Sequence, residues 1–473
     1  MGTIDASLNI KLGELLTQQT GLLQRFDGGF TQIESSKNSA ITTIENKKIE
    51  VVNHLQTIIT PIVNSIGVAG SFGFGKGVAP DAIASEYGMI GIGDYNNPLS
   101  DTYGNYMHAL SGSVMVWVPK HYVKYSYDIN APYYGQRIDV SATLASDYKL
   151  PRVFVNNGFE VAGVFVDKYK GGLEGNVFVS KRNLDPASTH VDHNPISQCT
   201  ANGQAPLNRY DGMYAAVKSR GDEFVEMSIF LATMLTDLGD AHYQACYRNN
   251  NFAACAWAFT APYAPKGCNN NALRDANDSS VVYTASGYAT CGLSGGVSDS
   301  VFAKITHCGQ KSGIADVNGL MWEVASGYIT DINGVHMVLK EEVDIATLTS
   351  ANAYDTTLYD VVSIPLTLNN TTVLFGNGTN QFYNGSTDRA TNAYKIDSLG
   401  LPKDDTAVST AGASRYGNDG FWRYQRNEMS PIVFGYWVHV SASGSRARSL
   451  NAVRGSSNTV VGGRAYLVPR RAG

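Results

Sequence analysis

The sequence FGYWVHVSASGSRARSLNAVRGSSNTVVGGRAYLV, residues 434–468, is the stretch of the chain that most limits which fold the chain can adopt. It opens with Gly435-Tyr436-Trp437 and closes with a Gly-Gly-Arg-Ala-Tyr run at 462–466. Between these ends small and polar residues predominate, and arginine, histidine and asparagine are spaced along the segment. We interpret the two ends as buried framework and the middle as a surface that displays varied side chains.

The composition of the whole chain suits recognition. Its 473 residues are enough for two or three domains, each with a sizeable core. Charged residues make up 16%, below the roughly 25% of an average domain, while the 27 tyrosines and 48 glycines are abundant. Tyrosine supplies a large, rigid contact area at low entropic cost, which favours a binding surface. The alternative is that a β-rich protein simply uses tyrosine in its strands.

Charge and hydropathy exclude several classes of protein. The formal net charge of −5 and the pI near 6.0 argue against a general nucleic-acid binder, which needs a basic face. No run of 18 apolar residues is present, so we expect no membrane span. The start of the chain, MGTIDASLNIKLGELL, lacks a basic region followed by a small-residue cleavage site, so we expect no secretory signal.

The six cysteines lie within one part of the chain, at Cys199, Cys246, Cys255, Cys268, Cys291 and Cys308. None has CxxC spacing, which argues against a zinc ribbon or a thioredoxin-type site. Up to three disulfides are possible, but free buried thiols are favoured if the protein folds in a reducing cytoplasm.

Residues 1–66 carry the only long helical pattern. Apolar side chains recur at alternating spacings of three and four residues, at Leu8, Leu12, Leu15, Leu22 and Phe26 and again at Ile41, Ile44, Val51, Leu55, Ile58 and Ile62. Asp27-Gly28-Gly29 is expected to interrupt the pattern. A lone helix cannot bury such a stripe, and isoleucine at both core positions favours three strands. We therefore predict a homotrimeric coiled-coil stalk, the alternative being a helix packed on its own globular domain.

The rest of the chain is expected to be β-rich with long loops. The glycine-rich run GVAGSFGFGKG, residues 67–77, suggests a hinge, and 67–110 a connector, with 78–110 left open as a small domain or part of the next one. Strand-like runs then follow at Val114–Val118, Val153–Val155, Val161–Val166, Val177–Val179, Met337–Leu339 and Val362–Leu366. One helix is expected over Met227–Gln244, where Gly239 can end or interrupt it. The predicted fold class is α+β and β-rich: a stalk followed by one domain over 111–473.

Five fragments of that domain resemble, in the same order, the motifs of the formylglycine-generating-enzyme-like branch of the C-type lectin fold. They are Met115–Pro119, Gly163–Tyr169, Arg220–Met227, Asn318–Val324 and Gly462–Ala465. The layout of 434–468 resembles the C-terminal segment of phage tail-fibre receptor-binding proteins that have this fold and are diversified by retroelements. Within these motifs we expect Trp322 to be a buried strand anchor, with Glu323 beside it held by arginine or backbone donors.

The resemblance implies a tail-fibre or tail-tip adhesin in a virion assembled in the host cytoplasm, with no enzymatic activity and no cofactor. Its partners would be a host cell-surface receptor, either protein or glycan, and other tail proteins at the stalk. The predicted receptor-binding residues are Tyr416, Trp422, Arg423, Tyr424, Tyr436, His439, Ser443, Arg446, Arg448, Asn451, Arg454 and Asn458.

Two kinds of protein are alternatives to the adhesin: an enzyme, of formylglycine-generating or glycan-cleaving type, and a structural virion protein. A formylglycine-generating enzyme depends on cysteines in the C-terminal part of its domain, and here no cysteine follows Cys308. A glycan-cleaving enzyme needs two carboxylates flanking the sugar bond, and the acidic run of Glu341, Glu342 and Asp344 is better interpreted as a solvated turn. A passive structural virion protein is the other alternative.

Calcium is the one metal considered. Oxygen donors at Asp316, Asn318, Asp331 and Asn333 are of the type that calcium takes, although they lack the EF-hand pattern. The prediction is that the protein needs no cofactor, with calcium as the alternative.

Overall fold

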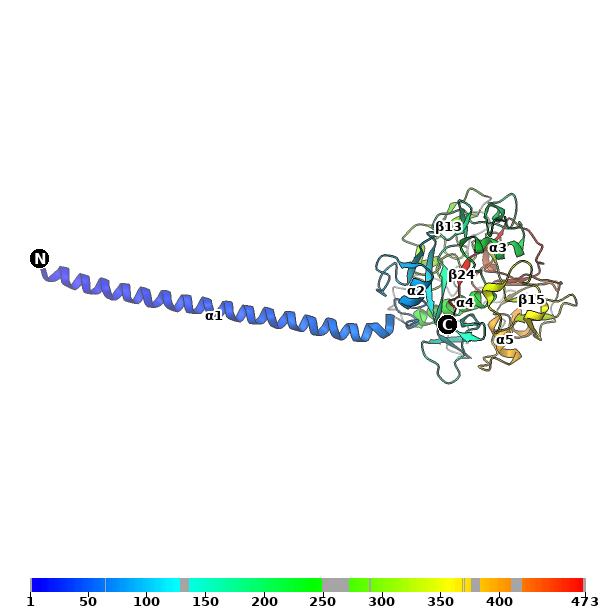
Figure 1. The fold of residues 1–473 in the computed structure, drawn as a ribbon. Coiled ribbons are helices and arrows are strands. Elements are labelled where there is room, and N and C mark those ends of the chain that lie inside the picture. The colour runs from blue at the N-terminus through cyan, green and yellow to red at the C-terminus, as the bar shows by residue number, and fades with distance from the viewer. Residues whose placement is uncertain are drawn as a thin grey trace. The chain divides into compact units, whose positions relative to one another are not determined.

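The computed structural model divides the chain into two compact units, Met1–Ile62 and Val63–Gly473 (Figure 1). It describes residues 2–63, 65–127, 136–248, 272–288, 291–367, 369, 371–375, 383–409 and 419–470.

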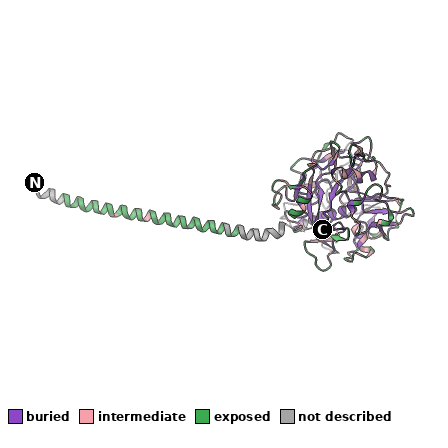
Figure 2. Ribbon diagram, in the orientation of Figure 1, coloured by how far each residue is buried: buried purple, intermediate pink, exposed green. Residues whose placement is uncertain are grey.

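The first unit is one helix, α1 (Gly2–Val63). The predicted interruption at Asp27-Gly28-Gly29 is wrong, because α1 continues through it. Each glycine in a helix interior costs only about 1 kcal/mol, which a helix of this length tolerates. The apolar stripe is uncovered: Leu12, Phe26 and Ile44 are 60%, 62% and 67% exposed (Figure 2). The coiled coil and its trimeric state stay predictions.

Two sheets form the framework of the second unit. One has six strands in the order β1-β2-β3-β8-β24-β11, and the other has seven in the order β19-β18-β20-β22-β21-β14-β23. Neighbouring strands are antiparallel except for the parallel pairs β20–β22 and β14–β23. The bounds of the first sheet are β1 (Met89–Gly91), β2 (Asn105–His108), β3 (Val114–Pro119), β8 (Gly163–Asp167), β24 (Ala465–Leu467) and β11 (Phe224–Glu226). Those of the second are β19 (Val408–Ser409), β18 (Thr371–Phe375), β20 (Gly420–Arg423), β22 (Arg448–Leu450), β21 (Ile432–Val433), β14 (Trp322–Val324) and β23 (Val461–Gly462).

Smaller elements surround these sheets. A three-stranded sheet joins β15 (Tyr328–Thr330), β16 (His336–Leu339) and β17 (Tyr359–Val361). Four strand pairs are β4 (Tyr122–Tyr127) with β5 (Gln136–Ser141), β6 (Val155–Asn156) with β7 (Phe159–Glu160), β9 (Gly172–Glu174) with β10 (Val177–Val179), and β12 (Tyr283–Ala285) with β13 (Gly292–Val297). The α-helices of this unit are α2 (Asp81–Glu86), α3 (Met213–Val217), α4 (Ile229–Arg248) and α5 (Asn392–Ser398).

The end of the 434–468 stretch ties the two sheets together. It places β23 in the seven-stranded sheet and, two residues later, β24 in the six-stranded sheet. Val461, Ala465, Tyr466 and Leu467 are all buried. The interpretation of this end as buried framework is therefore confirmed.

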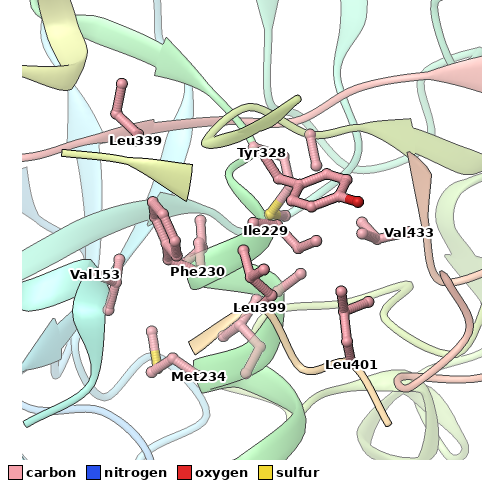
Figure 3. Close-up of a cluster of buried hydrophobic side chains, with 14 of the residues drawn as sticks. Val153, Ile229, Phe230, Met234, Tyr328, Leu339, Leu399, Leu401 and Val433 are labelled. Atoms are coloured by element: carbon pink, nitrogen blue, oxygen red, sulfur yellow. The ribbon is translucent and has the colours of Figure 1, made fainter. Parts of the chain in front are cut away.

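The helix α4 lies within the core. Its start is capped by Ser228, whose Oγ accepts a hydrogen bond of 3.1 Å from the Leu231 backbone N–H. Its side chains are buried almost all round, as expected for a central helix, and Figure 3 shows Ile229, Phe230 and Met234 within the core cluster. The predicted helix is confirmed, but Gly239 does not end it. A Cβ at Gly239 would lie 3.0 Å from the His307 carbonyl oxygen, so glycine permits a close contact there.

The predicted hinge and connector are corrected by the structure. Residues 89–91 and 105–108 form β1 and β2 of the six-stranded sheet, so 67–110 belongs to the second unit rather than preceding it. Phe74 and Lys76, within the glycine-rich run, are fully buried. Glycines at 67, 73 and 75 have φ values of +76° to +83°, so here glycine serves a tight packed loop and not a flexible hinge.

Most of the predicted strands are confirmed, and two are wrong. β3, β8, β10 and β16 match their predicted runs. Residues Arg152–Phe154 instead form a 3-10 turn after Pro151. Val362, Ile364 and Leu366 alternate into the core as strand residues do, yet no ladder forms there. Pro365 lies within that run and has no N–H to donate to a neighbouring strand.

The described cysteines differ in oxidation state. Cys199, Cys291 and Cys308 are free and buried, as predicted. Cys246 is disulfide-bonded, so the preference for free thiols is wrong at that position, and Cys255 and Cys268 lie outside the described residues. Across the described part of the chain, no helix has both the length and the apolar character needed to cross a membrane.

Candidate functional site

Three of the predicted site residues form a cluster of rings beside the seven-stranded sheet. We call Trp422, Tyr436 and His439 the aromatic patch; all three are half-buried. The Trp422 and His439 rings are stacked with centroids 4.5 Å apart, and Tyr436 meets His439 edge-on at 4.2 Å. In the same segment, Val438 is 40% exposed.

The patch rests on a buried tryptophan. Trp322 in β14 is 3% exposed, and its ring meets Trp422 edge-on at 5.5 Å and His439 at 5.4 Å. The prediction that Trp322 is a buried strand anchor is therefore confirmed. Such edge-to-face contacts add about 0.5–1.5 kcal/mol each beyond burial, so the exposed rings are held in place before any partner arrives.

A tight turn positions Tyr436 and His439. The Ser443 hydroxyl donates a hydrogen bond of 2.9 Å to the Tyr436 carbonyl, and the His439 backbone N–H donates one of 3.0 Å to the same oxygen. Gly319 lies against this turn with a φ of +102°, and a Cβ there would lie 2.4 Å from the Phe434 carbonyl oxygen. The Asn318–Val324 motif and the turn are thus packed directly together.

The aromatic patch is uncharged at neutral pH. Burial lowers the pKa of His439 to about 4, and its Nδ1 atom is buried with no hydrogen-bond partner among the described residues. The imidazole therefore acts as an aromatic ring rather than as a cation above about pH 5. The patch offers apolar ring surface with few polar atoms.

Four predicted site residues are buried, so the expectation that they are displayed is wrong. Arg446 forms an ion pair with Asp240 of α4 and donates a hydrogen bond of 2.9 Å to the Tyr383 hydroxyl. Arg448 donates to the Ser445 and Ala447 carbonyls, and Arg423 to the Leu366 carbonyl at 2.6 Å. Ser443, the fourth, holds the turn. These side chains donate hydrogen bonds to acceptors inside the protein. Residue type alone does not distinguish this role from exposure on a binding surface.

The remaining predicted residues lie apart from the ring contacts. Arg454 is half-buried and pairs with Asp211 at 2.9 Å and Glu428 at 3.3 Å. Tyr424 is half-buried beneath the Arg426 guanidinium, while Asn451 and Asn458 are exposed. Tyr416 lies outside the described residues. None of these described residues is joined to the aromatic patch by a ring contact, and their part in binding stays a prediction.

Glu323 is held as predicted. Its carboxylate accepts hydrogen bonds from Arg464 Nε at 3.2 Å and Nη2 at 3.1 Å, and forms an ion pair with Lys170. All three side chains are nearly or fully buried. Burial raises the pKa of Glu323, but the two cations outweigh burial and hold its pKa below the usual value. The carboxylate is therefore ionised and structural, and it fixes the position of β14.

A second buried carboxylate, Glu226 of β11, has the opposite character. Burial raises its pKa to about 7, and its Oε1 atom has no hydrogen-bond partner within the described residues. A folded-state pKa above the unfolded one means that the native protein binds the proton more tightly. Stability is therefore greatest below about pH 4.5 for this group, and it falls as the pH rises to about 7.

Replacing Glu226 by glutamine should remove this pH dependence. At pH 8 we expect Glu226→Gln to be more stable than the unaltered protein by about 3 kcal/mol, and at pH 5 nearly equal to it. Chemical denaturation at the two pH values measures the difference. Glu223→Gln, a half-buried neighbour, is the control and should show no such pH-dependent gain. Equal effects of Glu226→Gln at both pH values would show that the carboxyl is not protonated in the folded state.

Three of the residues considered for calcium bond to protein groups, although Asp316 Oδ1 is buried with no hydrogen-bond partner among the described residues. Asp316 accepts hydrogen bonds from the Gly295 N–H and the Ser294 hydroxyl, and Asp331 accepts from the Asn333 and Val335 N–H groups. The Asn318 amide donates to Asp275 at 3.2 Å. Within the described ranges no group of three or more His, Cys, Asp or Glu side chains is arranged to hold a metal ion. That the protein needs no cofactor, with calcium as the alternative, stays an untested prediction.

Comparison with solved structures finds similar chains. No family model matches the chain, and no curated protein matches it. A solved structure named Major Tropism Determinant U1 Variant matches with a TM-score of 0.27 and 10% sequence identity. The match covers 75% of this chain and 63% of that one, less than two thirds of its length. A TM-score of this size identifies no common fold, so the C-type-lectin fold stays a prediction.

Proposed function

We propose that this protein is a phage tail-fibre or tail-tip adhesin that binds a host cell-surface receptor through the aromatic patch. The observation that carries the proposal is the cluster of Trp422, His439 and Tyr436, half-exposed and supported from below by Trp322. Tryptophan and tyrosine dominate the energetics of protein interfaces because each buries a large area with few rotatable bonds. A neutral ring surface held ready in this way is suited to binding a partner rather than to proton transfer.

Rigidity supports the proposal. The patch side chains come from β20 and from the turn after β21, both attached to the seven-stranded sheet. Ring contacts and the two hydrogen bonds to the Tyr436 carbonyl restrict their conformations before binding. Little conformational entropy is then lost on contact, and more of the interaction energy appears as affinity.

The helix α1 gives the proposal its valency. Its apolar stripe is uncovered along the described side chains, and a helix with such a stripe packs against partners. We propose that three copies associate through α1 and that the stalk also contacts other tail proteins. Three patches on one particle then bind a cell surface jointly, so that a weak single site gives firm adsorption. Assembly in the host cytoplasm into a virion tail is part of this proposal.

Truncating Trp422 tests the proposed surface. We expect Trp422→Ala to weaken adsorption of the full chain by at least about 30-fold, the effect of losing about 2 kcal/mol at an interface hot spot. The fluorescently labelled protein is titrated onto a panel of bacterial strains, and bound fluorescence per cell is measured by flow cytometry.

The matched control is Phe72→Ala, which removes a ring that is 49% exposed and is not one of the aromatic patch residues. It should leave adsorption unchanged, and unfolding curves of both variants check that each is folded. Adsorption that survives Trp422→Ala would remove the patch from the proposal. Cleavage of cell-surface glycan by the protein would instead favour the glycan-cleaving alternative.

A further inference from the structure

A well-formed cavity in the described part of the second unit has no assigned role. It has a volume of about 490 Å³, within the roughly 300–1,000 Å³ of small-molecule sites. It lies between the end of β16, the strand β17 and the helix α5. The aromatic patch residues are not among those that line it.

Both signs of charge line this cavity, and they are largely paired with each other. Arg389 Nε lies 3.1 and 3.0 Å from the two oxygens of Glu341, and Lys395 Nζ lies 2.8 Å from Asp360. Glu341 was expected to lie on a solvated turn, but its side chain is only 23% exposed and faces this cavity. The ion pairs fix the side chains that a ligand would meet.

The other polar groups of the cavity leave it nearly neutral. Arg152 is buried and donates hydrogen bonds to the Leu339 and Lys340 carbonyls. Glu342 and Asp388 add two carboxylates, so three cations and four carboxylates line the cavity, and its formal charge is −1. Val338, Leu339 and Ala390 supply apolar wall between the polar groups.

Paired charges of this kind favour one class of ligand. A carboxylate accepts about four hydrogen bonds and a guanidinium donates five, so Glu341, Arg389 and Asp360 keep unused capacity after pairing. A hydroxyl both donates and accepts, and it can bond to either member of a pair without separating them. An anionic ligand would have to displace Glu341 or Asp360 from its cation and leave that carboxylate unpaired, which is costly in a half-buried site.

We propose that this cavity binds a neutral saccharide, whose hydroxyls bond to the two ion pairs and whose C–H face packs on Ala390 and the β16 wall. The proposal stands on the cavity itself and does not depend on the adhesin function. In an adhesin the cavity would be a second contact site, separate from the aromatic patch.

Saturation-transfer NMR on the full chain tests the proposal. The neutral probes are glucose, galactose, mannose and N-acetylglucosamine, and the charged probe is the anion glucuronate. At least one neutral probe should receive saturation, and glucuronate should receive less. Ala390→Trp, which fills the exposed rim of the cavity, should weaken that binding at least roughly tenfold. Leu110→Trp, at a residue 90% exposed in another part of the unit, should have no effect.

A charge variant separates recognition from simple blocking. The double substitution Glu342→Gln with Asp388→Asn leaves both ion pairs in place and changes the formal charge of the cavity from −1 to +1. Asparagine at 388 can keep the cap on the Ala390 N–H. Binding of glucuronate relative to the neutral probe should rise by roughly tenfold. The proposal is overturned if no neutral probe binds, if Ala390→Trp leaves binding intact, or if the charge variant does not change this preference. Adsorption to cells, measured in parallel, tests the adhesin proposal separately.

Discussion

Glutamate at Ile41 and Ile44 should convert the proposed trimer to a monomer and reduce its adsorption to cells by roughly 10²- to 10⁴-fold. Both side chains are exposed in the single chain, at 44% and 67%, so the substitutions remove no contact within it. In a trimeric stalk the same positions would face the other two helices, where six unpaired carboxylates cannot be buried. The loss of adsorption follows from losing joint binding, because the aromatic patch itself is unchanged.

Sedimentation equilibrium measures the first part of this result. The mass should fall from three times 50.9 kDa to 50.9 kDa, and adsorption is measured on the same samples. Asn46→Glu is the matched control, because it places a new carboxylate on the opposite face of the same helix and should change neither quantity. A protein that is already monomeric, or a monomeric variant that adsorbs equally well, would contradict the proposed stalk.

Replacing Arg464 by methionine should destabilise the second unit by about 3–5 kcal/mol. Arg464 is fully buried, and besides Glu323 it serves the Asp167 carbonyl at 2.8 Å and the Ala315 carbonyl at 2.7 Å. Its loss leaves those acceptors unsatisfied and a carboxylate with Lys170 as its remaining cation. Because whole domains are stable by only about 5–15 kcal/mol, the change is a large part of the total.

Denaturant unfolding measures this loss, with Arg470→Met as the control. Arg470 has a side chain 56% exposed and a single ion pair to Asp344 at 3.3 Å, so its replacement should cost less than about 1 kcal/mol. Equal stability of the Arg464 and Arg470 variants would show that the buried ion group does not hold the framework.

The local sequence pattern was enough to predict those helices and strands whose apolar spacing can be seen within a short run of residues. The helix α4 was predicted from its spacing of apolar residues, and β3, β8, β10 and β16 from short apolar runs. Trp322 and Glu323 were placed correctly because a buried carboxylate requires a cationic or backbone partner, whichever residue supplies it. In each case the residues on which the prediction rests lie close together in the sequence.

The local pattern could not predict whether a polar side chain points into the protein or out to solvent. Nor could it predict which residue, distant in the sequence, that side chain pairs with. Arg446 looks like a display residue in a polar segment, but its partner Asp240 is 206 residues away in the sequence. The glycines of 67–77 indicate backbone freedom, which serves a packed loop as readily as a hinge. The cavity beside β16, β17 and α5 brings together Arg152, Glu341 and Arg389 from three separate segments of the chain. No local sequence motif indicates such an arrangement.

A photo-cross-linking amino acid at Tyr436 tests the central claim most directly. p-Benzoylphenylalanine replaces the ring at this half-exposed position, and the full chain is bound to intact cells of a strain that it adsorbs to and then irradiated. We predict covalent capture of a cell-surface component from position 436 and none from position 72, where Phe72 is 49% exposed and outside the aromatic patch. Capture from position 72 instead, or adsorption without any capture from position 436, would contradict the account.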